Sequence, residues 1–244
     1  TLRYFDHRLK SAGVTFKLGQ RVEVGDLAQG TFDHVVLATG VVPRRLDVPG
    51  GDYATVVTYI ELIEGRKVAG DKLAIIGAGG IGFDIAEFLT HPGDNKTALE
   101  RFQDEWGIDS TLAARGGLKP PEKETSPRQV WLLQRKTSKV GDGLAKTTGW
   151  IRRSLLTMRD VRMLAGATYE RIDDTGLHVS MGGKTQCLPV DTVVICAGQD
   201  PCRDLETSLR TAGIPYSLIG GADLAEELDA KRAIDQGTRL AARL

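Results

Sequence analysis

The chain has 244 residues, of which 41% are hydrophobic and 26% charged, a composition typical of a folded globular protein. Lysine plus arginine and aspartate plus glutamate both number 32, so no global field favours nucleic acid or an acidic membrane as partner. No apolar run reaches the roughly 18 residues of a membrane span, and three cysteines without a CxxC pair indicate no disulfide framework, as expected in the cytoplasm.

The N-terminal part of the chain predicts short alternating elements. Apolar residues with helical spacing predict a helix that is closed by Gly13, and residues 14–18 (VTFKL) favour a strand. Because Thr1 falls inside the predicted helix, we expect a fragment whose native N-terminus lies upstream. The next predicted elements are a polar connection (22–32), a buried strand ending in a glycine turn (33–40), a loop with two prolines (41–50) and a helix (55–68).

The middle of the chain opens with LAIIGAGGIGFDIAEFL (73–89), which predicts a strand, a glycine turn and a helix. From residue 91 to residue 128 the pattern changes to a long polar segment rich in glycine, proline and charge, an insertion of the kind that is often functional. Further predicted elements are a strand (130–133), an amphipathic helix (147–159), a strand (161–166), a β-meander (168–190), a strand with a glycine turn (191–198), and finally a loop, the strand YSLIGGAD (216–223) and a helix (224–244).

The glycine turn is the GxGxxG pattern of Gly77, Gly79 and Gly82, with Gly80 as a fourth glycine. The first glycine permits a tight turn, the second lets the backbone approach a pyrophosphate, and the third lets helix pack on strand. The free N–H groups of the helix N-terminus suit phosphates. A glycine-rich packing turn is the alternative, but the flanking strand and helix favour nucleotide binding.

The end of the following strand distinguishes NAD from NADP. An NAD site usually places an acid there, whereas an NADP site uses arginine for the 2′-phosphate. Here Gln134 is followed by two cations and two hydroxyls and by no acid: Arg135, Lys136, Thr137 and Ser138. The alternative is that these are solvated cations, which strand ends often carry. The two cations and two hydroxyls nevertheless suit a dianionic phosphate, and the planar guanidinium of Arg135 can bind it through two hydrogen bonds. The sequence therefore favours NADP.

Two similar strand-to-glycine turns bracket this unit, VVLATG with Thr39 and Gly40, and VVICAG with Gly198. Such a pair is expected where an NADPH domain is inserted into a flavin domain. Near the C-terminus, Asp223 follows Gly221 at a strand end and precedes a predicted helix, the place of an aspartate near an FAD ribityl chain. Asp223 alone also fits a helix N-cap.

These patterns predict an α/β fold in which a Rossmann-like NADPH-binding domain is inserted in the second half of an FAD-binding domain, with a β-meander. The predicted domains are a partial FAD segment (1–68), an NADPH-binding domain containing the insertion (69–190, insertion 91–128) and a C-terminal FAD segment (191–244). Residues 7, 34, 91 and 178, the four histidines, lack metal-ligand spacing, so we expect no metal site and no catalytic side chain.

Several segments together resemble the C-terminal part of the bacterial NADPH-dependent 2,4-dienoyl-CoA reductases, over nearly the whole chain. These segments are IIGAGGIGFDIAEFL, FQDEWGID, LLQRKTSK, GLAKTTGWIRR, RIDDTGLHV, VVICAGQ and LIGGADLAEELDAKRAIDQGTRLA. That family comprises iron–sulfur flavoenzymes of the old-yellow-enzyme superfamily, related to trimethylamine dehydrogenase and enoate reductases.

The resemblance implies that an FMN barrel, a 4Fe–4S cluster and the first FAD fingerprint precede this region in the same polypeptide. Electrons would pass from NADPH to FAD, the cluster, FMN and a dienoyl-CoA, so this fragment alone would not reduce the substrate and would hold half an FAD site. Implied NADPH contacts are Gly77, Gly79, Gly82, residues 135–138, Thr168 and Tyr169, while Thr39, Gly40, Gly221 and Asp223 fall on the FAD side. Trp150 either borders the nicotinamide or belongs to the core.

Two other functions stay open from the sequence. One is a non-catalytic module that holds ADP, as in the trimethylamine dehydrogenase branch, but such a module has no use for a 2′-phosphate pocket. The other is a stand-alone NADPH:flavin reductase, which needs a complete FAD site. Acyl-chain preference and oligomeric state are not predicted.

Overall fold

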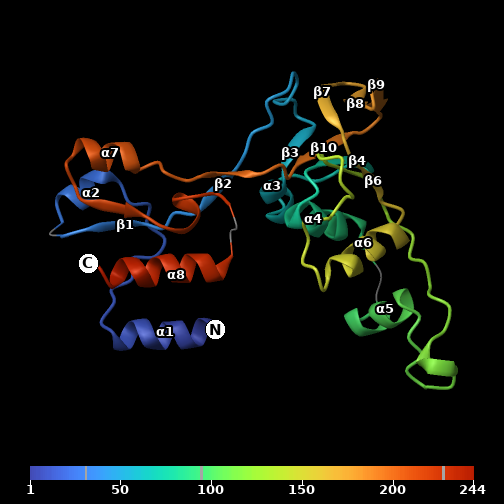
Figure 1. The fold of residues 1–244 in the computed structure, drawn as a ribbon, viewed down its shortest axis with the longest axis horizontal. Helices are drawn as coiled ribbons and strands as arrows, with labels where there is room; N and C mark the ends of the chain where they lie inside the picture. Colours follow the sequence, from blue (N-terminus) through green and yellow to red (C-terminus); the bar gives the residue numbers. More distant parts are fainter. Residues whose placement is uncertain (31, 94–95, 227–228) are drawn as a thin grey trace. The chain divides into compact units, whose positions relative to one another are not determined.

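The structure is a computed structural model that describes residues 1–30, 32–93, 96–226 and 229–244 (Figure 1). It divides into two compact units. Unit 1 combines the two ends of the chain, Thr1–Val41 and Pro201–Leu244, and unit 2 is the segment between them, Val42–Asp200. The units thus divide after residues 41 and 200, whereas the sequence places domain boundaries after residues 68 and 190.

The chain passes between the units in two short strands, β2 (Val41–Pro43) and β11 (Gln199–Pro201), which pair with each other. The prediction of a loop over residues 41–50 is therefore wrong for β2. A three-residue strand is defined by its partner, and this partner is remote in sequence, so no local pattern indicates it.

Unit 2 is built on a five-stranded parallel sheet in the order β3-β10-β4-β5-β6. The central strands β10, β4 and β5 are almost entirely buried, as expected for strands covered on both faces. The strands are β3 (Val56–Thr58), β10 (Thr192–Ile195), β4 (Lys72–Ile76), β5 (Gln129–Leu133) and β6 (Arg162–Leu164).

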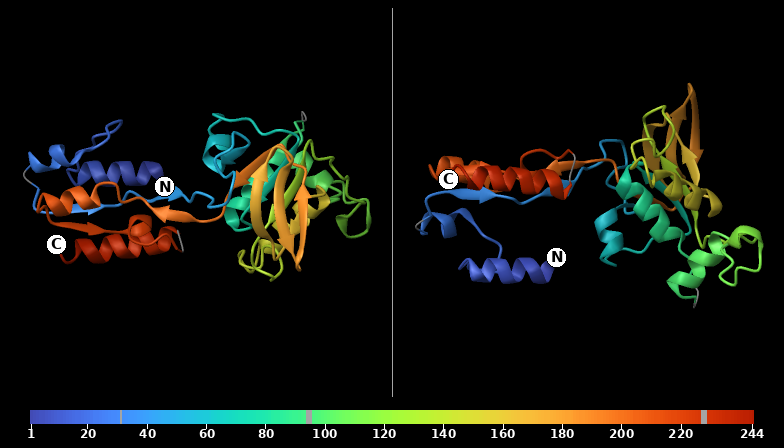
Figure 2. Two further views of the ribbon diagram at one scale, coloured as in Figure 1. Left: turned by 90° about the horizontal axis from the view of Figure 1, so that it is seen from above. Right: turned by 60° about the horizontal axis from the view of Figure 1, so that its bottom comes forward.

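Alternate residues of the central strand β4 pack against different elements on the two faces of the sheet. Leu73 and Ile75 pack with residues of α4 (Gly80–Thr90) and α6 (Gly149–Met158) on one face. Ala74 and Ile76 pack on the other face against a β-meander, β7 (Thr168–Asp173), β8 (Gly176–Met181) and β9 (Lys184–Leu188). Figure 2 shows the meander and α4 on opposite sides of the sheet. The predicted α/β fold with a Rossmann-like parallel sheet is confirmed.

The predicted helix over residues 55–68 is wrong at its start, because β3 occupies Val56–Thr58 and α3 spans Tyr59–Ile63. Two β-branched valines favour the strand. Thr58 and Glu61 then form a reciprocal capping box, in which each backbone N–H donates to the other side chain, and this fixes the start of the helix.

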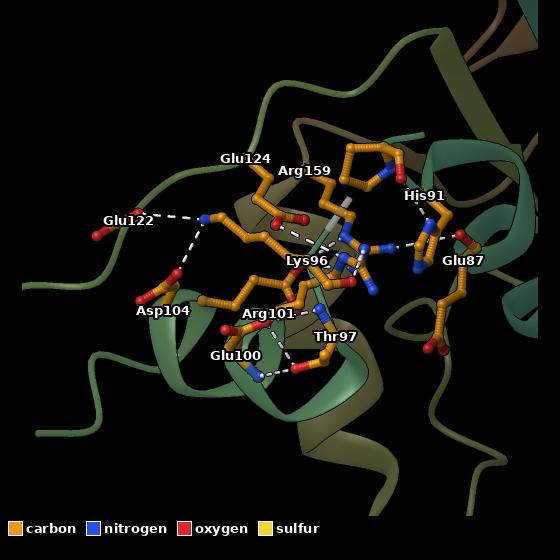
Figure 3. A network of polar contacts seen from close by, with 12 residues as sticks. Glu87, His91, Lys96, Thr97, Glu100, Arg101, Asp104, Glu122, Glu124 and Arg159 are labelled. Carbon is orange, nitrogen blue, oxygen red and sulfur yellow. Dashed lines mark hydrogen bonds and ion pairs between the residues drawn. The ribbon is translucent and has the colours of Figure 1, made fainter. Parts of the chain in front are cut away.

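The insertion 91–128 contains α5 (Ala98–Glu105) and a short 3-10 turn, η1 (Arg115–Gly117). A polar network holds it in place (Figure 3). The buried Glu105 pairs with the buried Arg159, which follows α6, at 2.6 Å, and Arg159 also donates to the Glu87 carbonyl of α4. Lys96 pairs with Asp104 at 2.9 Å within the insertion. The insertion is therefore a folded excursion anchored to both helices.

Unit 1 has a two-stranded parallel sheet of β1 and β12. Among the described residues, all but three of the buried apolar side chains of the protein lie in unit 2; the exceptions are Leu37, Leu209 and Ala222. The elements of unit 1 are α1 (Leu2–Ser11), α2 (Val24–Ala28), β1 (Val35–Leu37), α7 (Glu206–Thr211), β12 (Tyr216–Leu218), η2 (Gly220–Ala222) and α8 (Ala230–Ala241).

Four sequence expectations in unit 1 are corrected. Residues 14–18 form no strand, since no described strand pairs with them and their apolar side chains stay exposed. The C-terminal helix begins at Ala230 and not at residue 224, because the carboxylate of Asp229 accepts the Arg232 N–H at 2.8 Å and caps it. The predicted polar connection and the loop before β12 contain the helices α2 and α7. No helix in the described ranges is long and apolar enough to cross a bilayer.

Candidate functional site

The turn between β4 and α4 holds the GxGxxG glycines. Gly77 has φ +109°, and a Cβ there would lie 2.5 Å from the carbonyl oxygen of Cys196. A Cβ on Gly82 would lie 1.8 Å from the Gly77 carbonyl oxygen. Both positions therefore exclude side chains, whereas a Cβ on Gly79 would meet no atom within 4 Å. The second glycine faces open space.

Gly79 is also the N-cap of α4 and supplies no capping side chain. The N–H groups of the first helical turn lack intrahelical acceptors, and Gly79 and Gly80 are exposed. This eleven-residue helix thus presents free donors and its positive dipole end beside an open backbone surface. Such an arrangement suits a pyrophosphate.

The loop after β5 lies next to the glycine turn, because β5 is the neighbour of β4 and the Gly77 N–H donates to the Leu133 carbonyl at 2.9 Å. The side-chain amide of Gln134 donates to the carbonyls of Lys136, at 3.0 Å, and Ser138, at 2.7 Å. These bonds fold the loop tightly back on Gln134.

The four side chains predicted to hold a 2′-phosphate, Arg135, Lys136, Thr137 and Ser138, are all exposed on this loop. Among the described residues, no ion pair or side-chain hydrogen bond engages the charged group of Arg135 or Lys136. Two cations without a counter-charge at the carboxyl end of a parallel strand form a local positive site.

Tyr169 lies beside this loop. Burial raises the pKa of its phenol to about 12, while the charge of Arg135 nearby acts in the opposite direction. The Gly166 N–H donates to the Lys136 carbonyl at 2.9 Å and ties the chain before β7 to the loop. Thr168, the first residue of β7, is exposed next to Tyr169. The structure therefore brings these two residues to the cationic loop.

Trp150, at the start of α6, is 52% exposed, so its interpretation as a core residue is wrong. Its ring stands edge-on to that of Trp106 in the insertion, with centroids 6.1 Å apart. With Lys139, Arg153 and Met163 it lines a groove of about 600 Å³ that follows α6.

Unit 1 brings together three of the residues predicted on the FAD side. Gly40 has φ +74°, and a Cβ on Gly221 would lie 3.0 Å from the Gly40 carbonyl carbon. The Thr39 hydroxyl donates to the Cys202 carbonyl at 2.5 Å, and the Cys202 N–H donates to the Gly40 carbonyl at 3.0 Å. The two glycine turns after β1 and β12 therefore touch.

Asp223 follows η2 and lies well before α8, so its interpretation as the N-cap of that helix is wrong. Gln236 of α8 instead connects the two elements. Its side-chain amide donates to the Asp223 carboxylate at 2.7 Å and its oxygen accepts the Gly220 N–H at 2.7 Å. Gln236 therefore fixes the aspartate on its turn.

Gly198 lies in unit 2, where it has φ +91° and lies beside the Arg44 side chain. The next residue, Gln199, makes a contact that sequence reasoning missed. The Gln199 side-chain amide donates to the Tyr59 hydroxyl at 2.8 Å. Tyr59 immediately follows β3, and the β-branched run before it was an available signal. The clamp formed by Gln236 has no such signal.

Within the described ranges, no group of three or more His, Cys, Asp or Glu side chains is placed to hold a metal ion. Cys196 is buried at the end of β10, and burial raises the pKa of its thiol to about 12. A thiol with that pKa stays protonated at neutral pH and is a poor nucleophile.

Residues 5–230 match the family model described as pyridine nucleotide-disulphide oxidoreductase. The chain belongs to this family. Its members bind FAD and NAD(P)H, which agrees with a parallel sheet carrying a glycine turn in unit 2. The chain is 27% identical to a metal reductase of Desulforamulus reducens, over 80% of the chain and 28% of that protein. It is 23% identical to a cinnamate reductase of Clostridium sporogenes, over 93% of the chain and 29% of that protein.

Solved structures show the same fold in larger proteins. A 2-naphthoyl-CoA reductase in complex with 2-naphthoyl-CoA superposes with a TM-score of 0.74, at 21% identity, over all of this chain and 32% of its own. Histamine dehydrogenase from Rhizobium sp. 4-9 superposes with a TM-score of 0.68, at 17% identity, over all of this chain and 35% of its own. The chain therefore spans about a third of the length of these relatives.

Proposed function

We propose that the chain is the NADPH-binding, hydride-delivery module of a larger flavoenzyme reductase. The observation that carries this proposal is the pair of exposed cations, Arg135 and Lys136, which have no counter-charge among the described residues and follow the strand next to the glycine turn. A 2′-phosphate supplies the missing negative charge, and a guanidinium binds it through two parallel hydrogen bonds.

The residues of unit 2 would divide the dinucleotide between them. The open backbone at Gly79 and the free N–H groups of α4 would bind the pyrophosphate. Arg135, Lys136 and the hydroxyls of Thr137 and Ser138 would hold the 2′-phosphate, with Thr168 and Tyr169 closing the adenosine side. Binding in this mode orients the nucleotide along the carboxyl edge of the sheet, where ligands of open parallel sheets bind.

Unit 1 has features that fit part of an FAD site. Gly40 and Gly221 keep the turns after β1 and β12 free of side chains, and Thr39 and Asp223 add polar groups there. These residues would hold one side of the isoalloxazine and ribityl parts. When bound, FAD would accept the hydride of NADPH and release its electrons one at a time.

The substrate proposal rests on the motif resemblance. We place the full-length protein among NADPH-dependent 2,4-dienoyl-CoA reductases of unsaturated fatty acid oxidation, with an FMN barrel and a 4Fe–4S cluster in other parts of the polypeptide. A 2-naphthoyl-CoA reductase among the similar structures supports a thioester of an unsaturated acid as the substrate class. Electrons would then leave this module through FAD.

Calorimetric titration of the chain with NADPH and with NADH, in the presence and absence of FAD, tests the proposal. We expect tight binding of NADPH and weak binding of NADH. Equal affinities for NADPH and NADH would show that the cationic loop does not bind the 2′-phosphate. A preference for ADP over 2′-phospho-ADP would instead favour the alternative of a non-catalytic, nucleotide-holding module.

A further inference from the structure

The hydrogen bond between Tyr59 and Gln199 links the ends of two parallel strands. Tyr59 follows β3 and packs against the core cluster on the α4 face, and Gln199 lies four residues beyond β10. The Gln199 amide nitrogen lies 2.8 Å from the Tyr59 oxygen. A partly buried aromatic side chain thus holds an amide at the carboxyl edge of the sheet.

The other end of this amide has no partner in the described part of the chain. The Gln199 Oε1 atom is buried and makes no hydrogen bond to any described residue. A hydroxyl both donates and accepts, so Tyr59 can pair with either end of the amide, and the opposite end is unpaired in both orientations. Buried polar groups without partners are rare and destabilising, which points to a group that is paired only when a ligand is present.

The sheet places this amide on a defined side of the glycine turn. Thr58, Ile195 and Ile76 lie in one row across β3, β10 and β4, so Tyr59 and Gly77 both begin the next row. The cationic loop follows β5, on the opposite side of β4. A dinucleotide whose adenosine end lies at β5 and whose pyrophosphate lies at β4 extends its other end toward β10 and β3.

We infer that Gln199, positioned by Tyr59, is a specificity residue that pairs with the carboxamide of the nicotinamide ring. A carboxamide carries both a donor and an acceptor, and the free end of the Gln199 amide complements it in either orientation. This inference rests on the proposed function, since it assigns the second half of the same nucleotide.

The test uses three ligands that separate the two halves of the site. NADP⁺ carries the carboxamide, nicotinic acid adenine dinucleotide phosphate carries a carboxylate in its place, and 2′,5′-ADP lacks the whole nicotinamide half. Calorimetry on the full chain would compare the wild type with Gln199→Leu and Tyr59→Phe. Gln186→Leu, an exposed glutamine on β9, is the matched control.

We expect Gln199→Leu to weaken NADP⁺ binding about 3- to 10-fold, the loss of one hydrogen bond. Its affinity for 2′,5′-ADP should be unchanged, and its preference for NADP⁺ over the carboxylate analogue should disappear. Tyr59→Phe should shift the same two quantities by less, because it loosens the amide without removing it. Gln186→Leu should match the wild type with all three ligands.

Each contrary result has a distinct meaning. Unchanged NADP⁺ binding and selectivity in Gln199→Leu would overturn the inference and leave the proposed function standing. An equal loss of NADP⁺ and 2′,5′-ADP affinity would show a purely structural role for Gln199 and would also overturn it. A wild-type chain that binds none of the three ligands would refute the proposed function, and the inference with it.

Discussion

The two units differ in how they are held together. Unit 2 covers both faces of its sheet and buries apolar side chains in two clusters. Unit 1 has a two-stranded sheet, and its long helices α1 and α8 bury no residue fully. Apolar side chains of unit 1 such as Leu2, Phe5 and Leu18 are 48–86% exposed. Since burial of apolar surface drives folding, we expect unit 2 to be the more stable of the two.

The difference also separates the two proposed nucleotide sites. The glycine turn of unit 2 follows a buried strand and its helix packs in the same core cluster, whereas the turns of unit 1 depend on side-chain bonds such as those of Gln236. Matched substitutions in the two units test both the difference in stability and the difference between the proposed nucleotide sites. All three tryptophans, residues 106, 131 and 150, lie in unit 2, so tryptophan fluorescence reports on this unit alone.

The largest effect is expected from breaking the buried ion pair of unit 2. Arg159→Met leaves the buried Glu105 carboxylate without its partner and should lower the free energy of unfolding by about 3–5 kcal/mol. Urea unfolding followed by tryptophan fluorescence measures it. The double variant Glu105→Leu/Arg159→Met should recover most of the loss. Arg239→Met in unit 1 removes an exposed pair with Asp235 and should leave the hydrogen exchange of unit 1 unchanged.

Leucine truncation tests packing in each unit directly. Leu132 and Leu209 are both 0% exposed, in unit 2 and unit 1 respectively. We expect Leu132→Ala to cost about 3–5 kcal/mol and Leu209→Ala about 2–3 kcal/mol, because the loosely packed unit can collapse around the cavity. Hydrogen exchange resolved by peptide measures each loss in its own unit. Equal losses would contradict the difference in packing.

Arg135→Ala in unit 2 and Asp223→Ala in unit 1 compare the contributions of the two units to NADPH binding. The proposed role of Arg135 predicts a loss of NADPH affinity on the order of 1.5–3 kcal/mol, for one charge-assisted hydrogen bond, with little change for NADH. Asp223→Ala, in unit 1, should leave both affinities unchanged. Calorimetry on the two variants decides the matter, and equal losses of NADPH and NADH affinity in Arg135→Ala would show that this arginine does not contact the phosphate.

The smallest effect is a difference in acid sensitivity. In the described part of the chain, every carboxyl group with a resolved lowered pKa lies in unit 2: Glu61, Glu100, Asp104, Asp109 and Asp173. A lowered folded-state pKa stabilises above the ordinary pKa of about 4, and that contribution is lost as the pH falls further. Unit 2 should therefore lose stability below pH 4. Asp173→Asn, which replaces the ionisable carboxylate that accepts from Thr175 and His178, should reduce this slope.

The sequence predicts unit 2 better than unit 1 for a physical reason. Its central strands are continuous apolar runs bounded by glycine, and the meander has turns marked by DDTG and MGGK. These are local signals, and β4, β5, β10 and the meander are confirmed. The strand β3 was missed because Val56–Thr58 runs directly into a helix, and only the Thr58–Glu61 box separates them.

Several errors in unit 1, and in the two strands where the chain passes between the units, concern elements whose identity depends on remote partners. The strands β2 and β11 form only because they pair with each other. Residues 14–18 have the sequence pattern of a strand, but no described strand pairs with them. The candidate site follows the same rule. The motif residues are found from the sequence, whereas the pairings of Tyr59 with Gln199 and of Gln236 with Asp223 are made only by folding. The β-branched run before Tyr59 marks its strand but does not indicate its partner.

The pairing of β1 with β12 also sets an order of events during synthesis. Val35 pairs with Tyr216, about 180 residues further along the chain. The ribosome must therefore complete all of the intervening segment before unit 1 can close its sheet. A folded unit 2 brings β2 and β11 together and so shortens the loop that β1 and β12 must close, which lowers the entropy cost of their pairing. Folding of unit 2 therefore promotes folding of unit 1, and slow folding of unit 2 delays unit 1 as well.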